Sequence, residues 1–278
     1  LAFFAPAFSG VAKKIKKYLD ATIMVICHNI IPHEEHLLDT RLTKRFFGFI
    51  DSFIVLSNKV ENELLSFVPG AKYKYSPHPV YNIFKNTLSK EQAKAELKIA
   101  TKKVLLFFGL IRKYKGLDIL INAMEKINTE LEDYTLLIVG ECYENKDKYI
   151  DLIKKAGITD NVHCHYSFVP DNEVGKYFSA SDVVVLPYKT ASQSGIVQIA
   201  YHFDTPVIVS NVGGLPEIVD EGKTGYCVEP SSNAFAKAIK AFYEKDNISE
   251  LNSNISDYKS QFSWNAMVNA IEELVNVH

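Results

Sequence analysis

The chain has 278 residues, of which 47% are hydrophobic and 23% charged, and a formal net charge of −2. This size and balance suit a globular protein of about two domains with a sizeable core. No apolar run approaches the roughly 18 residues that a membrane span needs, which favours a soluble or peripheral protein.

Cysteine usage points to a reducing compartment. The four cysteines, Cys27, Cys142, Cys164 and Cys227, lie far apart and show neither C-x-x-C nor zinc-finger spacing. We expect them to be reduced thiols in the core, which favours the cytoplasm. No initiator Met, signal peptide or transit peptide is visible, so the chain is expected to start inside a longer one.

The first 88 residues are basic, with 11 Lys and Arg against 7 Asp and Glu. Within them, "VAKKIKKYLD" predicts a helix with an apolar stripe. The stripe consists of Val11, Ile15, Tyr18 and Leu19, and the lysines off it are Lys13, Lys14, Lys16 and Lys17. These lysines indicate either a solvated helix face or a peripheral contact with anionic lipid at the inner face of a membrane. No nucleic-acid partner is expected, since no basic-aromatic interleaving follows.

Short apolar, β-rich runs alternate with helical patterns along the chain. The runs lie at 23–27, 53–56, 104–108, 135–139, 183–186 and 206–209. Continuous apolar strands separated by helices indicate parallel sheets covered on both faces, hence the α/β class.

A domain boundary is expected near residues 78–90, where "SPHPVYNIFKNTL" has two prolines and no helical period. Ser89 and Gln92 then form a capping box. The following "GLDILINAMEKI" predicts a core-facing helix, whose buried stripe is Leu117, Leu120, Ile121, Met124 and Ile127. Residues 1–88 supply two convincing strands, too few for a complete doubly wound domain, so part of this domain is expected to be missing.

The stretch "TASQSGIVQIAYHFDTPVIVSNVGGLPE" at 190–217 predicts a buried helix from Ile196 to Phe203 that follows the strand "VVVLP". Ser194 or Ser192 can cap this helix, and Gly195 keeps its first turn free of a side chain. Such a helix start attracts phosphate through free N–H groups and the helix dipole. A cap without any ligand is the alternative.

A second strand-to-loop stretch, "FFGLIRKYKG" at 107–116, carries Arg112 and Lys115. Ligands of open parallel sheets bind outside the carboxyl ends of the strands, so these cations could face the same crevice as Gly195. An Arg fork and a Lys point charge suit a diphosphate, although a solvated basic loop is the alternative.

Several common site patterns are absent from the sequence. It has no D-x-D pair, no G-x-x-x-x-G-K-[ST] loop and no G-x-G-x-x-G, which disfavours a P-loop NTPase or a dinucleotide oxidoreductase. The segment from His33 to His36 fits no standard zinc spacing, so neither a metal nor another cofactor is expected. His28 ends the first apolar strand, a position that suits a catalytic group as well as a structural one.

These residues resemble the retaining, two-Rossmann (GT-B) glycosyltransferases of family 4, often called group 1. The resemblance is carried, in order, by "ICHNIIPHE", "FFGLIRKYKGLDILINAM", "LLIVGE", "VHCHYSFVPDNEVGKYFSASDVVVLPY" and "QSGIVQIAYHFDTPVIVSNVGGLPEIVDEGKTGYCV". It implies a partial N-terminal domain at 1–88, a donor-binding domain at 89–262, and a helix at 263–278, beginning near Trp264, that returns toward the first domain. It also implies a cytoplasmic enzyme that moves a sugar from a nucleotide-diphosphate donor to a hydroxyl of a glycan or lipid-linked glycan acceptor in surface polysaccharide assembly.

The resemblance assigns roles to particular residues. Arg112, Lys115 and the Ser194-Gly195-Ile196 turn would hold the donor diphosphate, and His28 would be catalytic near the donor sugar. The segment from Tyr166 through Phe168 to Val169 would form the wall that receives the nucleotide base.

The sequence also departs from the family pattern. The family usually has two glutamates eight positions apart, and Ala191 and Ile199 stand at those positions here, while Leu110 replaces an arginine. The side chains that could compensate are Gln193, Gln198 and Glu217. These departures keep two alternatives open: a non-catalytic sugar-nucleotide-binding partner subunit of a glycan-assembly complex, and a sugar-nucleotide epimerase on the same fold.

Overall fold

The computed structural model describes residues 5–19, 21–30, 39–84 and 88–275 of the chain. It divides the chain into two compact units, the first formed by the residues up to Pro79 together with those from Phe262 on, and the second by Val80–Gln261. The division between Pro79 and Val80 lies inside the range of residues 78–90 where a boundary is expected. Tyr81 and Phe84 belong to the second unit, where they pack along one of its helices, as described below.

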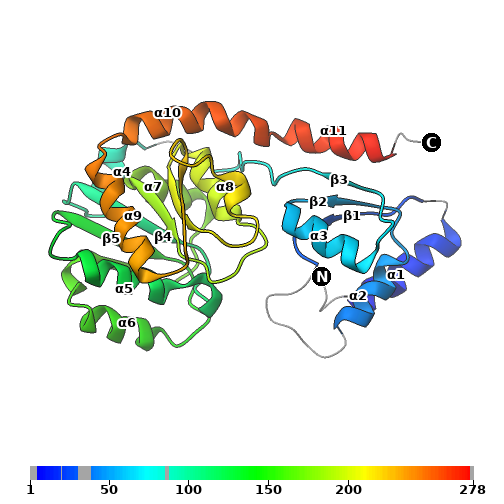
Figure 1. Cartoon of the computed structure of the whole chain (residues 1–278), viewed down its shortest axis with the longest axis horizontal. Helices are drawn as coiled ribbons and strands as arrows, with labels where there is room; N and C mark the ends of the chain where they lie inside the picture. The colour runs from blue at the N-terminus through cyan, green and yellow to red at the C-terminus, as the bar shows by residue number, and fades with distance from the viewer. Residues whose placement is uncertain (1–4, 20, 31–38, 85–87, 276–278) are drawn as a thin grey trace. The chain divides into compact units, whose positions relative to one another are not determined.

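The first unit contains a parallel sheet in the order β1-β2-β3 (Figure 1). Its strands are β1 (Met24–Cys27), β2 (Ser52–Val55) and β3 (Tyr73–Tyr75). The sequence predicted β1 and β2 within a residue of their observed ends. It missed β3, because this strand has only three residues and two of them are exposed, so it leaves no apolar run.

Strand β2 sends alternate side chains to opposite faces, as expected of a strand. Phe53 and Val55 join a core cluster that includes residues of α2 (Asp39–Phe47) and α3 (Asn58–Phe67). Ile54 joins a separate cluster with residues of the last helix, α11 (Trp264–Val275). Both faces of this strand are thus covered by helices.

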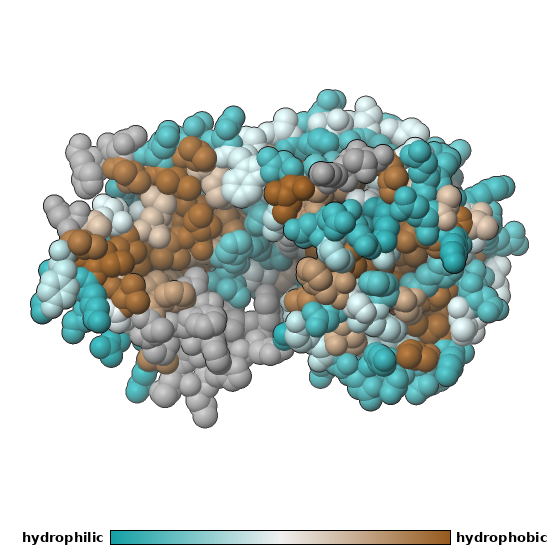
Figure 2. Space-filling view, turned by 180° about the vertical axis from the view of Figure 1, so that it is seen from behind, coloured by the Kyte–Doolittle hydropathy of each residue, from teal (hydrophilic) through white to brown (hydrophobic). Residues whose placement is uncertain are grey.

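Helix α1 (Ala5–Tyr18) packs against the rest of the first unit through residues other than the predicted apolar stripe. Ser9 and Ala12 are buried, and the Lys16 ammonium bonds the Asp51 carboxylate, with Nζ 2.6 Å from Oδ1. Val11 and Tyr18, expected on the buried side, are 55% and 69% exposed. Ser9, Ala12 and Lys16 lie on one side of the helix. The small side chains of Ser9 and Ala12 and the ion pair of Lys16 bring that side close to the rest of the unit. Apolar side chains of this unit reach the surface in Figure 2.

The second unit contains a six-stranded parallel sheet in the order β6-β5-β4-β7-β8-β9. Its strands are β4 (Lys103–Phe108), β5 (Tyr134–Val139), β6 (Val162–His165), β7 (Val183–Leu186), β8 (Val207–Ser210) and β9 (Gly225–Val228). This is the doubly wound order 3-2-1-4-5-6, in which the winding reverses between β4 and β7. Together with the parallel sheet of the first unit, it confirms the predicted α/β class.

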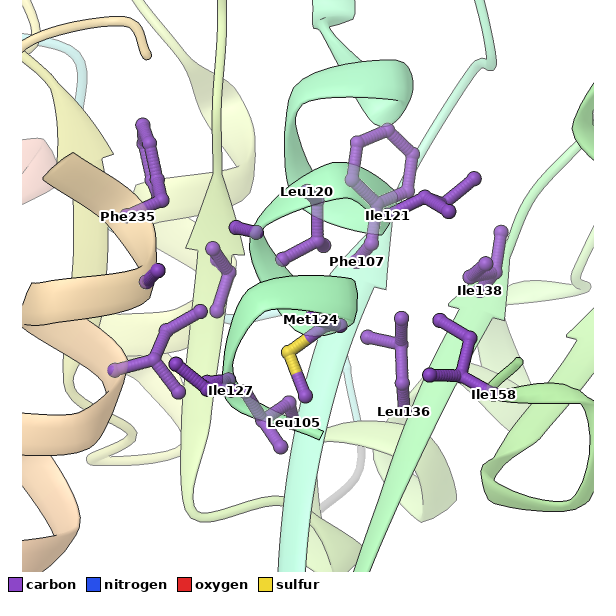
Figure 3. Close-up of a cluster of buried hydrophobic side chains, with 14 of the residues drawn as sticks. Leu105, Phe107, Leu120, Ile121, Met124, Ile127, Leu136, Ile138, Ile158 and Phe235 are labelled. Carbon is purple, nitrogen blue, oxygen red and sulfur yellow. The ribbon is translucent and has the colours of Figure 1, made fainter. Parts of the chain in front are cut away.

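Helices cover both faces of this sheet. They are α4 (Lys90–Glu96), α5 (Leu117–Ile127), α6 (Lys146–Lys155), α7 (Asp171–Ala180), α8 (Gly195–His202), α9 (Ser232–Glu244) and α10 (Ile248–Tyr258). The capping box predicted at Ser89 and Gln92 opens α4. All five residues of the predicted α5 stripe are at most 4% exposed. Figure 3 shows Leu120, Ile121, Met124 and Ile127 of α5 among Phe107 of β4, Ile138 of β5 and Phe235 of α9.

The cysteines differ from the prediction of four core thiols. All four are free, but only Cys27 is buried, and Cys164 is exposed because it lies on the edge strand β6. Burial raises the pKa of the Cys27 thiol to about 12. Within the described ranges, no helix combines the length and hydropathy that crossing a bilayer requires.

Candidate functional site

The strand ends at the reversal of the second sheet lie close to the start of α8. A Cβ atom on Gly109, which follows β4, would lie 3.2 Å from Cδ1 of Ile196 in the first turn of α8. A Cβ atom on Gly140, which follows β5, would lie 2.0 Å from the carbonyl oxygen of Gly109. Any side chain at Gly140 would therefore separate these segments. The two motifs singled out in the sequence do meet at one edge of the sheet, where doubly wound folds bind ligands.

Ser194 is the N-cap of α8. Its Oγ accepts a hydrogen bond from the backbone N–H of Ile196 at 3.3 Å. Ser192, the other predicted candidate, does not cap the helix; it is buried, and its backbone carbonyl accepts a hydrogen bond from the N–H of Gly214. The cap leaves other first-turn N–H groups without an intrahelical partner, which is the condition for attracting an anion.

Lys115 lies close to this helix start. Its Nζ is 3.8 Å from the centre of the Tyr188 ring, and the Tyr188 hydroxyl lies 3.3 Å from Oγ of Ser194. The loops after β4 and β7 are also joined by a backbone hydrogen bond from Lys189 to Tyr114. Tyr188 thus links the predicted cation to the predicted cap. The sequence did not single out this tyrosine, because its link to Lys115 depends on two loops more than 70 positions apart.

Arg112 lies on the other side of the β4 end. Its guanidinium carbon is 4.8 Å from the centre of the Tyr143 ring, and the Tyr143 hydroxyl donates a hydrogen bond to Oε2 of Glu141 at 3.1 Å. An isolated parallel bridge between Ile111 and Cys142 aligns the two loops. Arg112 therefore flanks the end of β5, whereas Lys115 flanks the end of β7.

A cavity of about 260 Å³ opens beside these loops. Its lining residues are Phe84, Phe108, Gly109, Leu110, Gly140, Glu141, Phe168, Val169, Asp171, Val174, Ile196 and Ile199. Most of them are apolar, and Phe168 is 68% exposed, so its side chain is accessible to a ligand.

Tyr166 does not line this cavity. It packs against the hydrophobic core of the second unit, and burial raises the pKa of its hydroxyl. Phe168 and Val169 are the members of the predicted base wall that do line it. The difference arises because Tyr166 follows the edge strand β6 directly and its ring turns inward, while the next residues lead out to α7.

The two positions where the family usually has glutamates are apolar and buried. Ala191 is 2% exposed, and Ile199 is 7% exposed and lines the cavity. Gln198 is fully buried, and neither of its amide atoms has a hydrogen-bond partner among the described residues. Gln193 and Glu217 are partly exposed, on the two loops that the Gly214-to-Ser192 bond joins. Of these three candidate compensating residues, none is among the residues that line the cavity.

His28 lies in the first unit, directly after β1. Its ring centre is 5.8 Å from that of His78, whose Nδ1 lies 2.8 Å from the carbonyl oxygen of Pro79. Burial lowers the pKa of both histidines, and the charge of His78 lowers that of His28 further. The sequence did not identify His78, because 50 positions separate the pair. The segment from His33 to His36 lies outside the described residues, among which no three His, Cys, Asp or Glu side chains group closely enough to hold a metal ion.

A doubly wound unit with its crevice at the winding reversal, in a chain with a second parallel α/β unit, is the architecture of two-Rossmann GT-B proteins. Residues 89–262 match the family model described as glycosyl transferases group 1. The chain belongs to this family.

Curated relatives are similar over part of their length. A D-inositol 3-phosphate glycosyltransferase of Corynebacterium aurimucosum is 30% identical over 193 residues, which cover 66% of this chain and 45% of that protein. Spore coat protein SA of Bacillus subtilis is 27% identical over 204 residues, covering 68% and 52%. The chain spans about half the length of these relatives.

Solved structures share the fold at low sequence identity. HepE of Anabaena in complex with UDP has a TM-score of 0.82 and 19% identity, and the match covers 99% of this chain and 77% of that one. A sucrose-phosphate synthase from Thermosynechococcus elongatus has a TM-score of 0.81 and 22% identity, covering 96% and 70%.

Proposed function

We propose that this chain carries the donor-binding part of a retaining glycosyltransferase that uses a nucleotide-diphosphate sugar. The observation that carries the proposal is the link from Lys115 through Tyr188 to Ser194 at the start of α8. It combines the positive charge of a lysine with a helix N-terminus, two groups that together stabilise a diphosphate. Arg112, on the β5 side of the same loop, supplies a second cation.

The cavity beside the loops suits the rest of the donor. Phe168 offers an aromatic face for the nucleotide base, and Glu141 is a carboxylate that can accept hydrogen bonds from a sugar diol. HepE of Anabaena, which shares the fold, was solved in complex with UDP. This supports a nucleotide as the ligand proposed for this chain.

The proposed reaction is a front-face transfer. An acceptor hydroxyl oxygen attacks the anomeric carbon on the side of the leaving group, the bond from that carbon to the diphosphate oxygen breaks, and the departing diphosphate takes the acceptor proton. The protein supplies alignment and positive charge, so no protein nucleophile is needed. Arg112, Lys115 and the α8 start provide that charge, so the proposed transfer needs no metal ion. His28 is proposed to contact the donor sugar.

The wider role is proposed from relatives. WaaG, a fold relative at 16% identity, is described as involved in lipopolysaccharide biosynthesis, and a Klebsiella pneumoniae protein of a cps region is 30% identical over 124 residues. We propose a glycan or lipid-linked glycan acceptor and assembly at the cytoplasmic face of a membrane.

A ligand panel tests the donor site. The chain is titrated with UDP, GDP, ADP and CDP, with and without EDTA, while its melting temperature is recorded. A ligand at 100 times its Kd adds about 2.7 kcal/mol to the free energy of unfolding, which raises the melting temperature by several degrees. Stabilisation by one diphosphate in EDTA supports the proposal and identifies the base. A flat panel would contradict a nucleotide donor.

Lys115→Ala should weaken binding of that diphosphate by about 1.5–3 kcal/mol, because it removes a charged partner of the phosphates. Lys113→Ala is the matched control, since Lys113 belongs to the same short helical turn (Lys113–Lys115) and is exposed. Equal losses in both variants would show a general effect of net charge instead.

One observation favours a second candidate function, a non-catalytic partner subunit. Ile199 places an aliphatic side chain in the cavity wall where the family usually has a glutamate. Sugar transfer or slow donor hydrolysis by the full-length protein would reject this candidate. Diphosphate binding without either reaction would favour it.

A further inference from the structure

The space beside Gly195 is occupied by a tyrosine of the same unit. A Cβ atom on Gly195 would lie 3.1 Å from the hydroxyl oxygen of Tyr81 and 3.4 Å from its Cε2. The sequence suggested that this position is small so that a diphosphate can approach. The structure shows that the nearest neighbour of a side chain there would be the Tyr81 hydroxyl.

Tyr81 is held in place along α8. Its ring centre is 6.0 Å from that of Phe84, which is buried and lines the cavity. The carbonyl oxygen of Phe84 accepts a hydrogen bond of 2.8 Å from Nε2 of His202, at the other end of α8. Residues 81–84 thus follow the helix from its first turn to its last.

The chemistry of the Tyr81 hydroxyl suits an anion. Burial raises the pKa of Tyr81, so the hydroxyl keeps its proton at neutral pH and can donate it in a hydrogen bond. It lies at the helix turn whose cap, Ser194, is linked through Tyr188 to Lys115. Tyr81 therefore places a hydroxyl against the first turn of a helix whose cap is connected to a cation.

We propose that Tyr81 is a phosphate-binding residue, whose hydroxyl donates a hydrogen bond to the anion held at the start of α8. The inference rests on the proposed function, since it needs a diphosphate at that position. It also explains the glycine at 195, because a larger residue would displace the donor hydroxyl.

Tyr81→Phe removes the hydroxyl and keeps the ring contact with Phe84. Binding of UDP, GDP, ADP, CDP and inorganic pyrophosphate to this variant and to the wild-type chain is measured by titration calorimetry. We expect about tenfold weaker binding of pyrophosphate and of the preferred nucleotide, the range for a lost hydrogen bond to a charged group. Tyr226→Phe, on strand β9, is the matched control and should bind as the wild type does.

The outcomes separate two failures. Wild-type affinity in Tyr81→Phe, or a loss for nucleotides with none for pyrophosphate, would overturn the role of Tyr81 and leave the proposed function intact. Absence of binding of all five ligands by the wild-type chain would overturn the proposed function, and the role of Tyr81 with it.

A double-mutant comparison tests the geometry without ligand. Gly195→Ala should lower the melting temperature of the wild-type chain more than that of the Tyr81→Phe variant, because the remaining ring atoms lie at 3.4 Å and 3.7 Å, an ordinary contact distance. An equal effect in both backgrounds would show that the hydroxyl does not limit the side chain at 195.

Discussion

At the scale of single residues, Gly116 determines the path of the loop that carries Lys115. Its φ of +68° lies in the left-handed region, and a Cβ atom there would lie 1.9 Å from the carbonyl oxygen of Pro187. The positive φ disfavours residues other than glycine, and the short distance to Pro187 excludes any side chain unless the backbone moves. The approach of the β4 loop to the β7 loop thus depends on the missing side chain.

Gly116→Ala should lower the free energy of unfolding by several kcal/mol, on the order of 3 or more, since it combines left-handed strain with overpacking. Gly157→Ala is the matched control, because Gly157 has a φ of +67° and nothing within 4 Å of its Cβ position. It should cost about 1–2 kcal/mol. Urea unfolding measures both, and equal costs would contradict the clash with Pro187.

The pair of His28 and His78 makes stability depend on pH. Because burial lowers the pKa of both, the unfolded chain binds protons more readily than the folded chain. Their destabilising effect is therefore absent above the unfolded pKa of about 6.5 and grows as the pH falls below it.

The melting temperature should thus fall between about pH 7.5 and about pH 5.5, and fall less in His78→Gln. His163→Gln, an exposed histidine on β6, is the control and should keep the wild-type dependence. An unchanged slope in His78→Gln would argue against this source of pH dependence.

At the scale of helices and strands, burial decided what could be predicted. The interior strands of the second sheet, β4, β5, β7 and β8, are continuous apolar runs, and the sequence placed each of them within a residue. The edge strands β6 and β9 were missed because their side chains are mostly exposed or partly exposed. In the site, the cap and the basic loop could be predicted from local chemistry. Tyr81, Tyr188 and His78 could not, because only the tertiary fold brings them to their partners.

Asp182 joins four elements at the start of β7. Its side chain is 5% exposed and accepts hydrogen bonds from the backbone N–H of Val104 at 2.6 Å and the hydroxyl of Tyr243 at 3.2 Å, and it pairs with Lys90 of α4. Asp182→Ala should lower the free energy of unfolding by about 3 kcal/mol, because it leaves buried partners unpaired. Asp182→Asn keeps an acceptor and should cost less in the same denaturant titration. Equal losses of stability in Asp182→Ala and Asp182→Asn would show that the negative charge of Asp182 accounts for the whole effect.

At the scale of the whole molecule, the second unit is continuous in sequence and has its own core. Residues 80–261 contain a large hydrophobic cluster that includes residues of β4, β5, β7 and β8. The solved C-terminal domain of a Francisella tularensis group 1 protein has a TM-score of 0.59 and 24% identity, and the match covers 66% of this chain and 97% of that one. A separate domain of this fold is therefore known to exist on its own.

A fragment of residues 80–261 should unfold cooperatively and retain diphosphate binding. A fragment of residues 89–261, which starts at the predicted boundary, should be less stable, since it lacks the packing of Tyr81 and Phe84 along α8. Thermal unfolding by circular dichroism compares the two. Identical melting temperatures would show that the 80–88 segment adds nothing to the second unit.

The first unit is discontinuous, because α11 covers the face of its sheet that carries Ile54 and Leu56. The carbonyl oxygen of Leu274 also accepts a hydrogen bond from Lys72, 202 positions earlier in the chain. During synthesis on the ribosome, the strands of this unit emerge long before the helix that covers them. The second unit can complete its core in that interval, while the exposed face of the first must wait for the last helix and is open to a chaperone until translation reaches it.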